Sequence, residues 1–259
     1  MSFALELKDL RKSFGKTEII RGISLAIPAG ERVGIIGPNG AGKSTLFNLI
    51  SGRFEPSSGE VLLDGQCLNG KKPFEINRLG LSRSFQVTNI FPKLSVFENL
   101  RCGVLWSLGY RYTFFRFLAD LKDANDRTDE LLEMVRLDKK RDILAMNLTY
   151  AEQRALEIGI TISGGAKVIL LDEPTAGMSK SETGRFIKLI KDVTVGKTLL
   201  TVEHDMGVVF GLADKIAVVV YGELLAYDTP EAVRANPLVQ EAYLGSSVAD
   251  LQAGGQQAC

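Results

Sequence analysis

The stretch Gly37-Pro38-Asn39-Gly40-Ala41-Gly42-Lys43-Ser44-Thr45 fits the pattern G-x-x-x-x-G-K-[ST], and it decides the fold. We expect a buried strand at residues 32–36 before it, and apolar residues recur at helical spacing at residues 46–50 after it. Strand, loop and helix in this order are the context that a phosphate-binding loop requires. A glycine-rich turn that matches by chance is the alternative, which the flanking elements disfavour.

The residue types in this loop suit a bound triphosphate. Gly37, Gly40 and Gly42 have no Cβ and therefore allow backbone N–H groups to approach the phosphates. The following helix directs its positive N-terminus toward the anion. Lys43 is placed to reach the β- and γ-phosphates, and the Ser44 hydroxyl is a candidate ligand of Mg²⁺. The loop therefore predicts a nucleotide site.

The composition predicts a folded globular protein that does not bind nucleic acid. Of the 259 residues 45% are hydrophobic, and 31 basic residues balance 31 acidic ones, so no strong positive field attracts a polyanion. Three cysteines without metal-ligand spacing favour a reducing compartment. No apolar run approaches the roughly 18 residues of a membrane span, and the N-terminus lacks a secretory signal pattern. We therefore expect a cytoplasmic protein.

The residues around the loop predict a small antiparallel sheet. Short strands are expected at residues 4–7 and 19–27, with a turn at Gly15-Lys16, and residues 59–65 add a strand closed by an Asp-Gly turn. Phe14 precedes the first turn. It is either a half-buried strand residue or a ligand contact, and both interpretations stay open.

Capping patterns predict helices in the middle of the chain. Ser95, Thr149 and Ser179 each stand three residues before a glutamate, which is the capping-box pattern that opens a helix. An amphipathic helix is expected through residues 121–135. The aromatic and basic segment 110–118 fits either packing within this helical region or contact with lipid headgroups or a membrane partner.

Polar residues follow two buried strands in the second half of the chain. Asp172 and Glu173 end the first strand, and His204, the only histidine, follows the second. Open α/β sheets bind ligands at the carboxyl ends of their strands. A pair of carboxylates there suits Mg²⁺ and an attacking water, although a solvated Asp-Glu turn would give the same pattern. A lone histidine is more often structural, but this position favours a functional one.

Several motifs together resemble the nucleotide-binding subunit of an ABC transporter over residues 3–245. They are, in chain order, the phosphate-binding loop, Gln86 at the end of a strand expected at 81–86, segment 148–153, Asp172-Glu173 and His204. The resemblance implies an α/β fold with a P-loop NTPase core of mainly parallel sheet, an N-terminal antiparallel β subdomain and an inserted α-helical subdomain. It implies a single domain over residues 1–245, with the core at about 1–87 and 165–228, the helical subdomain at about 88–164 and short C-terminal helices at about 229–245. Residues 246–259 are expected to form a mobile tail after this domain.

The resemblance also implies a role for each candidate residue. Phe14 would stack on adenine, and the loop would hold the phosphates of ATP. Mg²⁺ would be held by Ser44, Gln86 and Asp172. Catalysis would depend on Lys43, on Gln86 beside the lytic water, on Glu173, which would polarise that water, and on His204 at the γ-phosphate. Thr149, Ala151 and Glu152, within 148–153, would cap ATP bound to a second subunit.

More narrowly, residues 201–206 (Thr-Val-Glu-His-Asp-Met), residues 228–245 and Tyr150 resemble the ATPases of branched-chain (hydrophobic) amino-acid importers, whose relatives carry urea, amides or aromatic acids. This implies an ATP hydrolase on the cytoplasmic face of the bacterial inner membrane, with a second ATPase subunit, two transmembrane permease subunits and a periplasmic solute-binding protein. The chain departs from the family at Ala151, where glycine is usual, and at Ser179, where Asp or Asn is usual. These departures predict a non-identical partner ATPase.

Three alternatives remain open. The ATPases of lipid or lipopolysaccharide exporters resemble this subfamily closely. A soluble ABC protein of translation or DNA repair would act without a membrane partner, but such proteins carry two cassettes or a long coiled coil. A P-loop kinase would leave segment 148–153 and His204 without a role.

Overall fold

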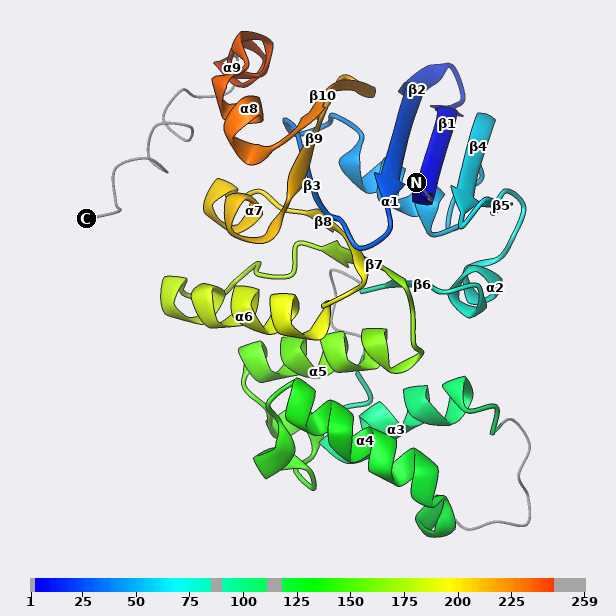
Figure 1. Ribbon diagram of the computed structural model, residues 1–259, viewed down its shortest axis with the longest axis vertical. Coiled ribbons are helices and arrows are strands. Elements are labelled where there is room, and N and C mark those ends of the chain that lie inside the picture. The colour runs from blue at the N-terminus through cyan, green and yellow to red at the C-terminus, as the bar shows by residue number, and fades with distance from the viewer. Residues whose placement is uncertain (1–2, 85–89, 111–117, 245–259) are drawn as a thin grey trace.

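The computed structural model describes residues 3–84, 90–110 and 118–244. It is an α/β structure in which two sheets occupy one part of the molecule and helices α3, α4 and α5 the opposite end (Figure 1). The predicted mainly parallel core sheet, the antiparallel sheet and the helical region inserted between strands of the core are confirmed. Among the described residues, no helix combines the length and apolar character needed to cross a membrane.

The smaller sheet is antiparallel and has the strand order β2-β1-β4-β5. Its strands are β1 (Phe3–Phe14), β2 (Thr17–Pro28), β4 (Ser58–Leu63) and β5 (Gln66–Cys67). The first two are longer than the sequence predicted, because polar residues on their exposed positions interrupt the apolar pattern while backbone pairing continues to Phe14–Thr17. Asp64 and Gly65 both have positive φ, 47° and 79°, and form the expected turn.

The larger sheet carries the candidate site and has the order β10-β9-β3-β8-β7-β6. Strands β9 to β6 run parallel, and β10 pairs antiparallel at one edge. Their bounds are β3 (Arg32–Ile36), β6 (Leu81–Arg83), β7 (Val168–Asp172), β8 (Thr198–Val202), β9 (Lys215–Val220) and β10 (Glu223–Asp228). The strand expected at 81–86 is thus seen over its first three residues, and Gln86 lies outside the described residues.

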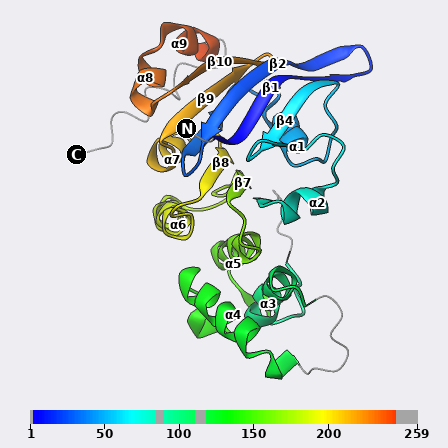
Figure 2. The ribbon, with the colours of Figure 1, turned by 45° about the vertical axis from the view of Figure 1, so that its right-hand side comes forward.

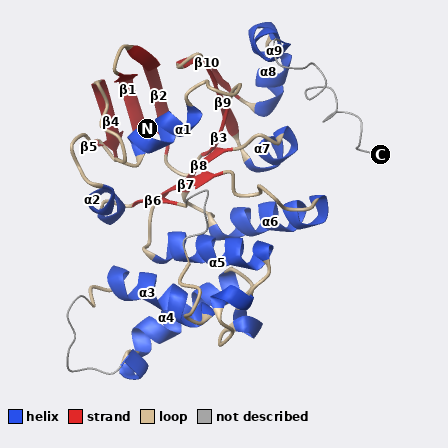
Figure 3. Cartoon of the chain, turned by 180° about the vertical axis from the view of Figure 1, so that it is seen from behind, coloured by secondary structure: helices blue, strands red, loops and turns tan. Residues whose placement is uncertain are grey.

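Helices cover this sheet and fill the far end of the molecule (Figures 2 and 3). Ser95, Thr149 and Ser179 are the N-caps of α3, α5 and α6, as their capping boxes predicted. The helices are α1 (Lys43–Ile50), α2 (Pro73–Arg78), α3 (Val96–Ser107), α4 (Lys122–Met134), α5 (Tyr150–Ser163), α6 (Lys180–Val193), α7 (Met206–Leu212), α8 (Pro230–Ala235) and α9 (Pro237–Leu244), with 3-10 turns at η1 (Leu118–Asp120), η2 (Asp138–Lys140) and η3 (Ala145–Asn147).

The parallel sheet is apolar on both faces, because each face is covered. Along β7, Val168 and Leu170 pack in the core shared with α1 and the antiparallel sheet, whereas Ile169 and Leu171 pack in the core of α3 to α6. These four residues are at most 1% exposed. The strand ends are therefore fixed from both sides, and the polar residues that follow them are held in place.

Candidate nucleotide-binding site

The phosphate-binding loop joins β3 to α1, and the backbone requires two of its glycines. A Cβ on Gly37 would lie 2.0 Å from the carbonyl oxygen of Val219, which no side chain tolerates. Gly42, the N-cap of α1, has a φ of 101°, in the left-handed region that favours glycine. The loop therefore turns sharply into α1, whose first backbone N–H groups have no partner within the helix.

Lys43 is the first residue of α1, and its side chain folds back into the loop. The residue is 6% exposed, and its Nζ donates to the carbonyl oxygens of Gly37 at 2.6 Å and Pro38 at 3.0 Å. Burial lowers the pKa of Lys43, while the nearby Glu173 carboxylate acts in the opposite direction. The ammonium is thus held where a phosphate in the loop would accept its hydrogen bonds. Ser44, beside it, is exposed to the same cavity.

Asp172 ends β7, next to the end of β8, and Glu173 follows it directly. Asp172 is 7% exposed and pairs in register with Val202 of β8. Its Oδ2 accepts a hydrogen bond from Nη2 of Arg83 at 2.8 Å. Glu173 has a φ of 46°, and its N–H donates to the carbonyl oxygen of Val202 at 2.9 Å. The backbone therefore leaves the extended conformation between the two carboxylates.

Glu173 and His204 lie against each other across these strand ends. Oε1 of Glu173 is 2.9 Å from Nε2 of His204, and the two side chains are 21% and 52% exposed. The pair lines a cavity of about 440 Å³ together with the loop residues Asn39 to Thr45. A carboxylate and an imidazole thus face the place where a terminal phosphate would lie.

Phe14 also lines this cavity. It ends β1, is 45% exposed, and meets the ring of Phe54 edge-on, with centroids 5.4 Å apart and planes at 78°. Nζ of Lys12 lies 5.0 Å from its ring centroid. An aromatic side chain supported in this way offers a flat ring a surface to stack on.

Segment 148–153, called the signature segment from here on, lies apart from this cavity. Thr149, Ala151 and Glu152 form the start of α5 and line a different cavity, between α5, α6 and the end of α4. Glu152 accepts a hydrogen bond from the backbone N–H of Thr149 at 3.0 Å and from Lys140 at 2.8 Å; its pKa is lowered by these contacts although burial opposes the shift. The structure therefore groups Phe14, the loop, Glu173 and His204, but not the signature residues.

Three further charged residues support the site and were not singled out from the sequence. Glu203, 5% exposed, accepts hydrogen bonds from the backbone N–H and the hydroxyl of Thr175. Arg154 of α5 donates to the carbonyl oxygen of Glu173 at 2.9 Å, and Arg83 pairs with Asp172. Burial raises the pKa of Glu203. Glu203 could have been identified from the sequence, because it stands beside His204 at a strand end. Arg83 and Arg154 could not, because their contacts join segments that are distant in the sequence.

Comparison with known protein families agrees with this geometry. The family described as ABC transporter matches residues 20–176, and the family described as branched-chain amino acid ATP-binding cassette transporter matches residues 223–249. The high-affinity branched-chain amino acid transport ATP-binding protein LivG of Escherichia coli (strain K12) is 36% identical over 253 residues, 94% of this chain and 98% of LivG. BraF of Pseudomonas aeruginosa, described in the same words, is 34% identical over 255 residues, covering 94% of this chain and 98% of its own.

Solved structures of ATP-binding cassettes share the fold. The ADP conformation of MJ1267, an ATP-binding cassette of an ABC transporter, has a TM-score of 0.81 and 28% identity over 95% of this chain and 99% of its own. A dimeric post-hydrolysis state of the ATP-binding cassette MJ0796, bound to ADP and Pi, has a TM-score of 0.73 and 25% identity over 87% and 98% of the two chains.

Proposed function

We propose, from the premise that this chain belongs to the ABC transporter family of ATP-binding proteins, that it energises the import of branched-chain amino acids or of a related small solute such as urea, an amide or an aromatic acid. As a member of the family it is the ATP-hydrolysing subunit of a transporter. The observation that carries the choice of solute is the likeness to LivG and BraF over almost the whole chain. The match of residues 223–249 to the branched-chain cassettes supports it from a separate part of the sequence.

The described residues offer the donors that Mg²⁺ prefers. The Ser44 hydroxyl lies in the first turn of α1, and Oδ1 of Asp172 stays free of hydrogen bonds from the described residues while Arg83 holds Oδ2. Hard oxygen ligands with room for water fit Mg²⁺, which keeps several waters in nucleotide sites. In our proposal Ser44 and Asp172, with Gln86, hold the ion, which when bound neutralises charge on the β- and γ-phosphates.

The residues of the chain then divide the work of hydrolysis. The loop and Lys43 bind and orient the phosphates. Glu173 polarises the attacking water, and His204, 2.9 Å from Glu173 Oε1, contacts the γ-phosphate and fixes the direction of that carboxylate. Positioning and charge stabilisation are the main sources of catalysis in phosphoryl transfer.

A second ATPase subunit completes each site in this proposal. Because Thr149, Ala151 and Glu152 line a cavity other than that of the loop, the chain does not cap its own ATP. Two cassettes that close face to face would bring each signature segment to the other's nucleotide, and the dimeric state of MJ0796 supports such an assembly. Release after hydrolysis would be a rigid-body change between two subunits.

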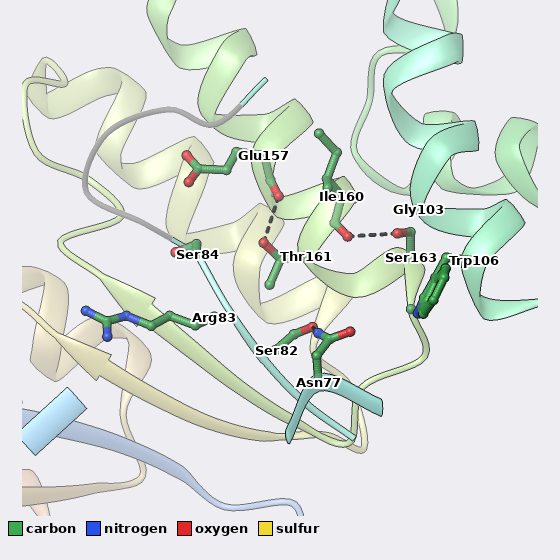
Figure 4. Close-up of a pocket in the computed structure, with 11 residues that line it drawn as sticks. Asn77, Ser82, Arg83, Ser84, Gly103, Trp106, Glu157, Ile160, Thr161 and Ser163 are labelled. Carbon is green, nitrogen blue, oxygen red and sulfur yellow. Dashed lines mark hydrogen bonds between the residues drawn. The ribbon is translucent and has the colours of Figure 1, made fainter. Parts of the chain in front are cut away.

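The membrane subunits are proposed to dock beside α3, on the cytoplasmic face of the inner membrane. Two neighbouring cavities, of about 280 and 330 Å³, share the lining residues Asn77, Arg83 and Trp106. Figure 4 shows the first of them, which is lined by residues of α2, β6, α3 and α5. The Arg78 guanidinium lies over the rings of both Phe74 and Trp106, which are 51% and 42% exposed. Exposed aromatic residues beside a cavity are typical of protein–protein interfaces.

We propose, from its aromatic and basic composition, that segment 110–118 also contacts the permeases. Tyr110 donates to the carboxylate of Asp123 at 2.8 Å, and residues 111–117 lie outside the described residues. In the assembled transporter, Trp106→Cys and Tyr112→Cys variants should cross-link to a permease, whereas Glu231→Cys should not. Equal labelling at all three positions would contradict this docking surface.

The solute is tested by reconstitution. The chain, its partner ATPase, both permeases and the periplasmic binding protein would be placed in proteoliposomes, and ATP hydrolysis measured with leucine, urea or an aromatic acid. Stimulation by leucine, absent in the Glu173→Gln variant, is the expected result. Stimulation by lipopolysaccharide or lipid without any binding protein would instead identify an exporter.

A further inference from the structure

Arg83 occupies a position that links three elements around the candidate metal site. Its Nη2 donates to Oδ2 of Asp172 at 2.8 Å, and its Nη1 donates to Oδ1 of Asn48 at 2.7 Å and to Oγ of Ser51 at 2.9 Å. The guanidinium also lies 5.5 Å from the ring centroid of Phe47. One side chain on β6 therefore contacts the end of β7 and one face of α1.

The surroundings make this a fixed arrangement. The side chains of Arg83 and Asp172 are 8% and 9% exposed, so water screens their attraction poorly. Backbone pairing of Arg83 with Leu170 places the two strands in register. In Figure 4 Arg83 extends from β6 on the side of the cavity away from Trp106. A planar guanidinium can hold a carboxylate and two further oxygens at once, which an ammonium does with much less geometric precision.

The two carboxylate oxygens of Asp172 have different surroundings. Arg83 takes Oδ2, whereas Oδ1 receives no hydrogen bond from the described residues and is free to meet the hydration shell of a metal. Asn48 lies in the last turn of α1 and Ser51 is its C-cap, and the first residue of this helix is Lys43. The guanidinium therefore ties the carboxylate to the same rigid helix that carries the phosphate-binding loop.

We propose that Arg83 is a positioning residue that orients Asp172 toward Mg²⁺ and keeps it in register with the phosphate-binding loop. The proposal rests on the role of Asp172 proposed above. The alternative is that the ion pair contributes only to folding, as many buried pairs do. The substitution Arg83→Lys separates these two roles, because lysine keeps the positive charge beside Asp172 but lacks the planar guanidinium that holds several oxygens at once.

The experiment is a Mg²⁺ titration of the binding of a fluorescent, non-hydrolysable ATP analogue to the purified chain. Arg83→Lys preserves the charge beside Asp172. The affinity for the nucleotide in EDTA should stay within about twofold of the parent. The Mg²⁺ concentration that gives half of the maximal enhancement of nucleotide binding should rise about tenfold, as expected when a residue that hydrogen-bonds to a metal ligand is replaced. Arg53→Lys, an exposed arginine just after α1, is the matched control and should change neither quantity.

A second variant keeps the ion pair intact. Asn48→Ala combined with Ser51→Ala removes the contacts to α1 and should raise the half-maximal Mg²⁺ concentration about threefold, with nucleotide binding in EDTA unchanged; it also serves if Arg83→Lys does not fold. Parental Mg²⁺ dependence in both variants, or an equal loss of binding with and without Mg²⁺, would overturn the proposal. If Asp172→Asn also leaves the Mg²⁺ dependence unchanged, the assignment of Asp172 fails, and this proposal fails with it.

Discussion

Glu173 contacts two residues that are distant from it in the sequence. Its side-chain Oε1 is 2.9 Å from Nε2 of His204, and its backbone carbonyl oxygen accepts a hydrogen bond from Arg154 of α5. The sequence predicted that Glu173 and His204 would share the carboxyl edge of the sheet. It could not predict Arg154, because that contact joins a helix start and a strand end through the folded chain.

Replacement of Glu173 by glutamine should separate nucleotide binding from hydrolysis. Glutamine can keep a hydrogen bond to His204 but cannot polarise the attacking water, so hydrolysis should fall at least about 100-fold while ATP binding stays within about twofold. Phosphate release in the assembled transporter measures the first, and analogue binding the second. Glu231→Gln, in the exposed first turn of α8, is the control. A parental rate in Glu173→Gln would show that another group activates the water.

Glu203 should make stability depend on pH. Burial raises its pKa above the ordinary 4.5, although hydrogen bonds from Thr175 oppose the shift. The folded state therefore binds this proton more tightly than the unfolded state. The stability that it contributes is complete below pH 4.5 and is lost as pH rises through the raised value.

Glu203→Gln cannot lose a proton and still accepts both hydrogen bonds from Thr175. Its Tm relative to the parent should therefore increase by about 2 °C between pH 4.5 and 7.5. Differential scanning calorimetry across this range, with Glu231→Gln in parallel, measures the effect. If the difference in Tm between Glu203→Gln and the parent stayed constant with pH, ionisation of the buried Glu203 carboxylate would not destabilise the folded state.

Most helices were predictable because their start signals are local. Capping boxes located α3, α5 and α6, and the apolar residues of the predicted amphipathic helix, Leu121 to Val135, are buried along α4. Helices α2 and α7 were missed, because six and seven residues give too short a periodic pattern, although Pro73 at the first position of α2 is a start signal. The subdomain boundaries at 87, 164 and 228 stay a prediction.

The capping box of α3 can be tested through stability. Ser95 Oγ accepts a hydrogen bond from the backbone N–H of Glu98 at 3.1 Å, and the Glu98 carboxylate accepts one from the N–H of Ser95 at 2.8 Å. Ser95→Ala should cost about 1 kcal/mol, because a helix N–H loses its acceptor. Urea unfolding of Ser95→Ala and of Ser107→Ala, at the other end of α3, provides the comparison. Equal losses would indicate that the cap contributes nothing specific.

Helix α5 connects two regions that act on different nucleotides in the proposed dimer. Its start carries the signature residues Thr149, Ala151 and Glu152, and one turn later Arg154 holds the backbone of Glu173. The hydroxyl of Tyr150 donates to the carbonyl oxygen of Ala176 at 3.0 Å, in the segment that follows Glu173. The signature of one site is thus mechanically joined to the catalytic turn of the other. Sequence motifs predicted both regions, whereas the connection depends on the packing of α5 against the sheet.

Two residues that depart from the family pattern, Ala151 and Ser179, lie at the starts of helices α5 and α6. Ala151 is in the first turn of α5, where a Cβ would stand between the backbone and a γ-phosphate of the opposite subunit. Ser179 is the N-cap of α6, and its hydroxyl accepts a hydrogen bond from the N–H of Glu182. We propose that both weaken the ATP site of the partner, while Lys43, Asp172, Glu173 and His204 remain in place for the chain's own ATP. These departures favour an asymmetric pair with a non-identical ATPase.

The asymmetry predicts how the isolated chain responds to restoring the usual residues. Ala151→Gly should raise its ATPase rate roughly tenfold, because each backbone donor to developing charge is worth about 10²–10³ in rate. Ser179→Asn is the better second change, since asparagine keeps the N-cap whereas aspartate would place a carboxylate against Glu182.

A partner that supplies an intact signature segment provides the second measurement. In that pair, the site that contains this chain's own ATP should hydrolyse it rapidly in the parent, and neither substitution should change the rate. Steady-state phosphate release from the chain alone and from the pair measures both. Full activity of the isolated parent, insensitive to Ala151→Gly, would mean that the chain works as a symmetric homodimer.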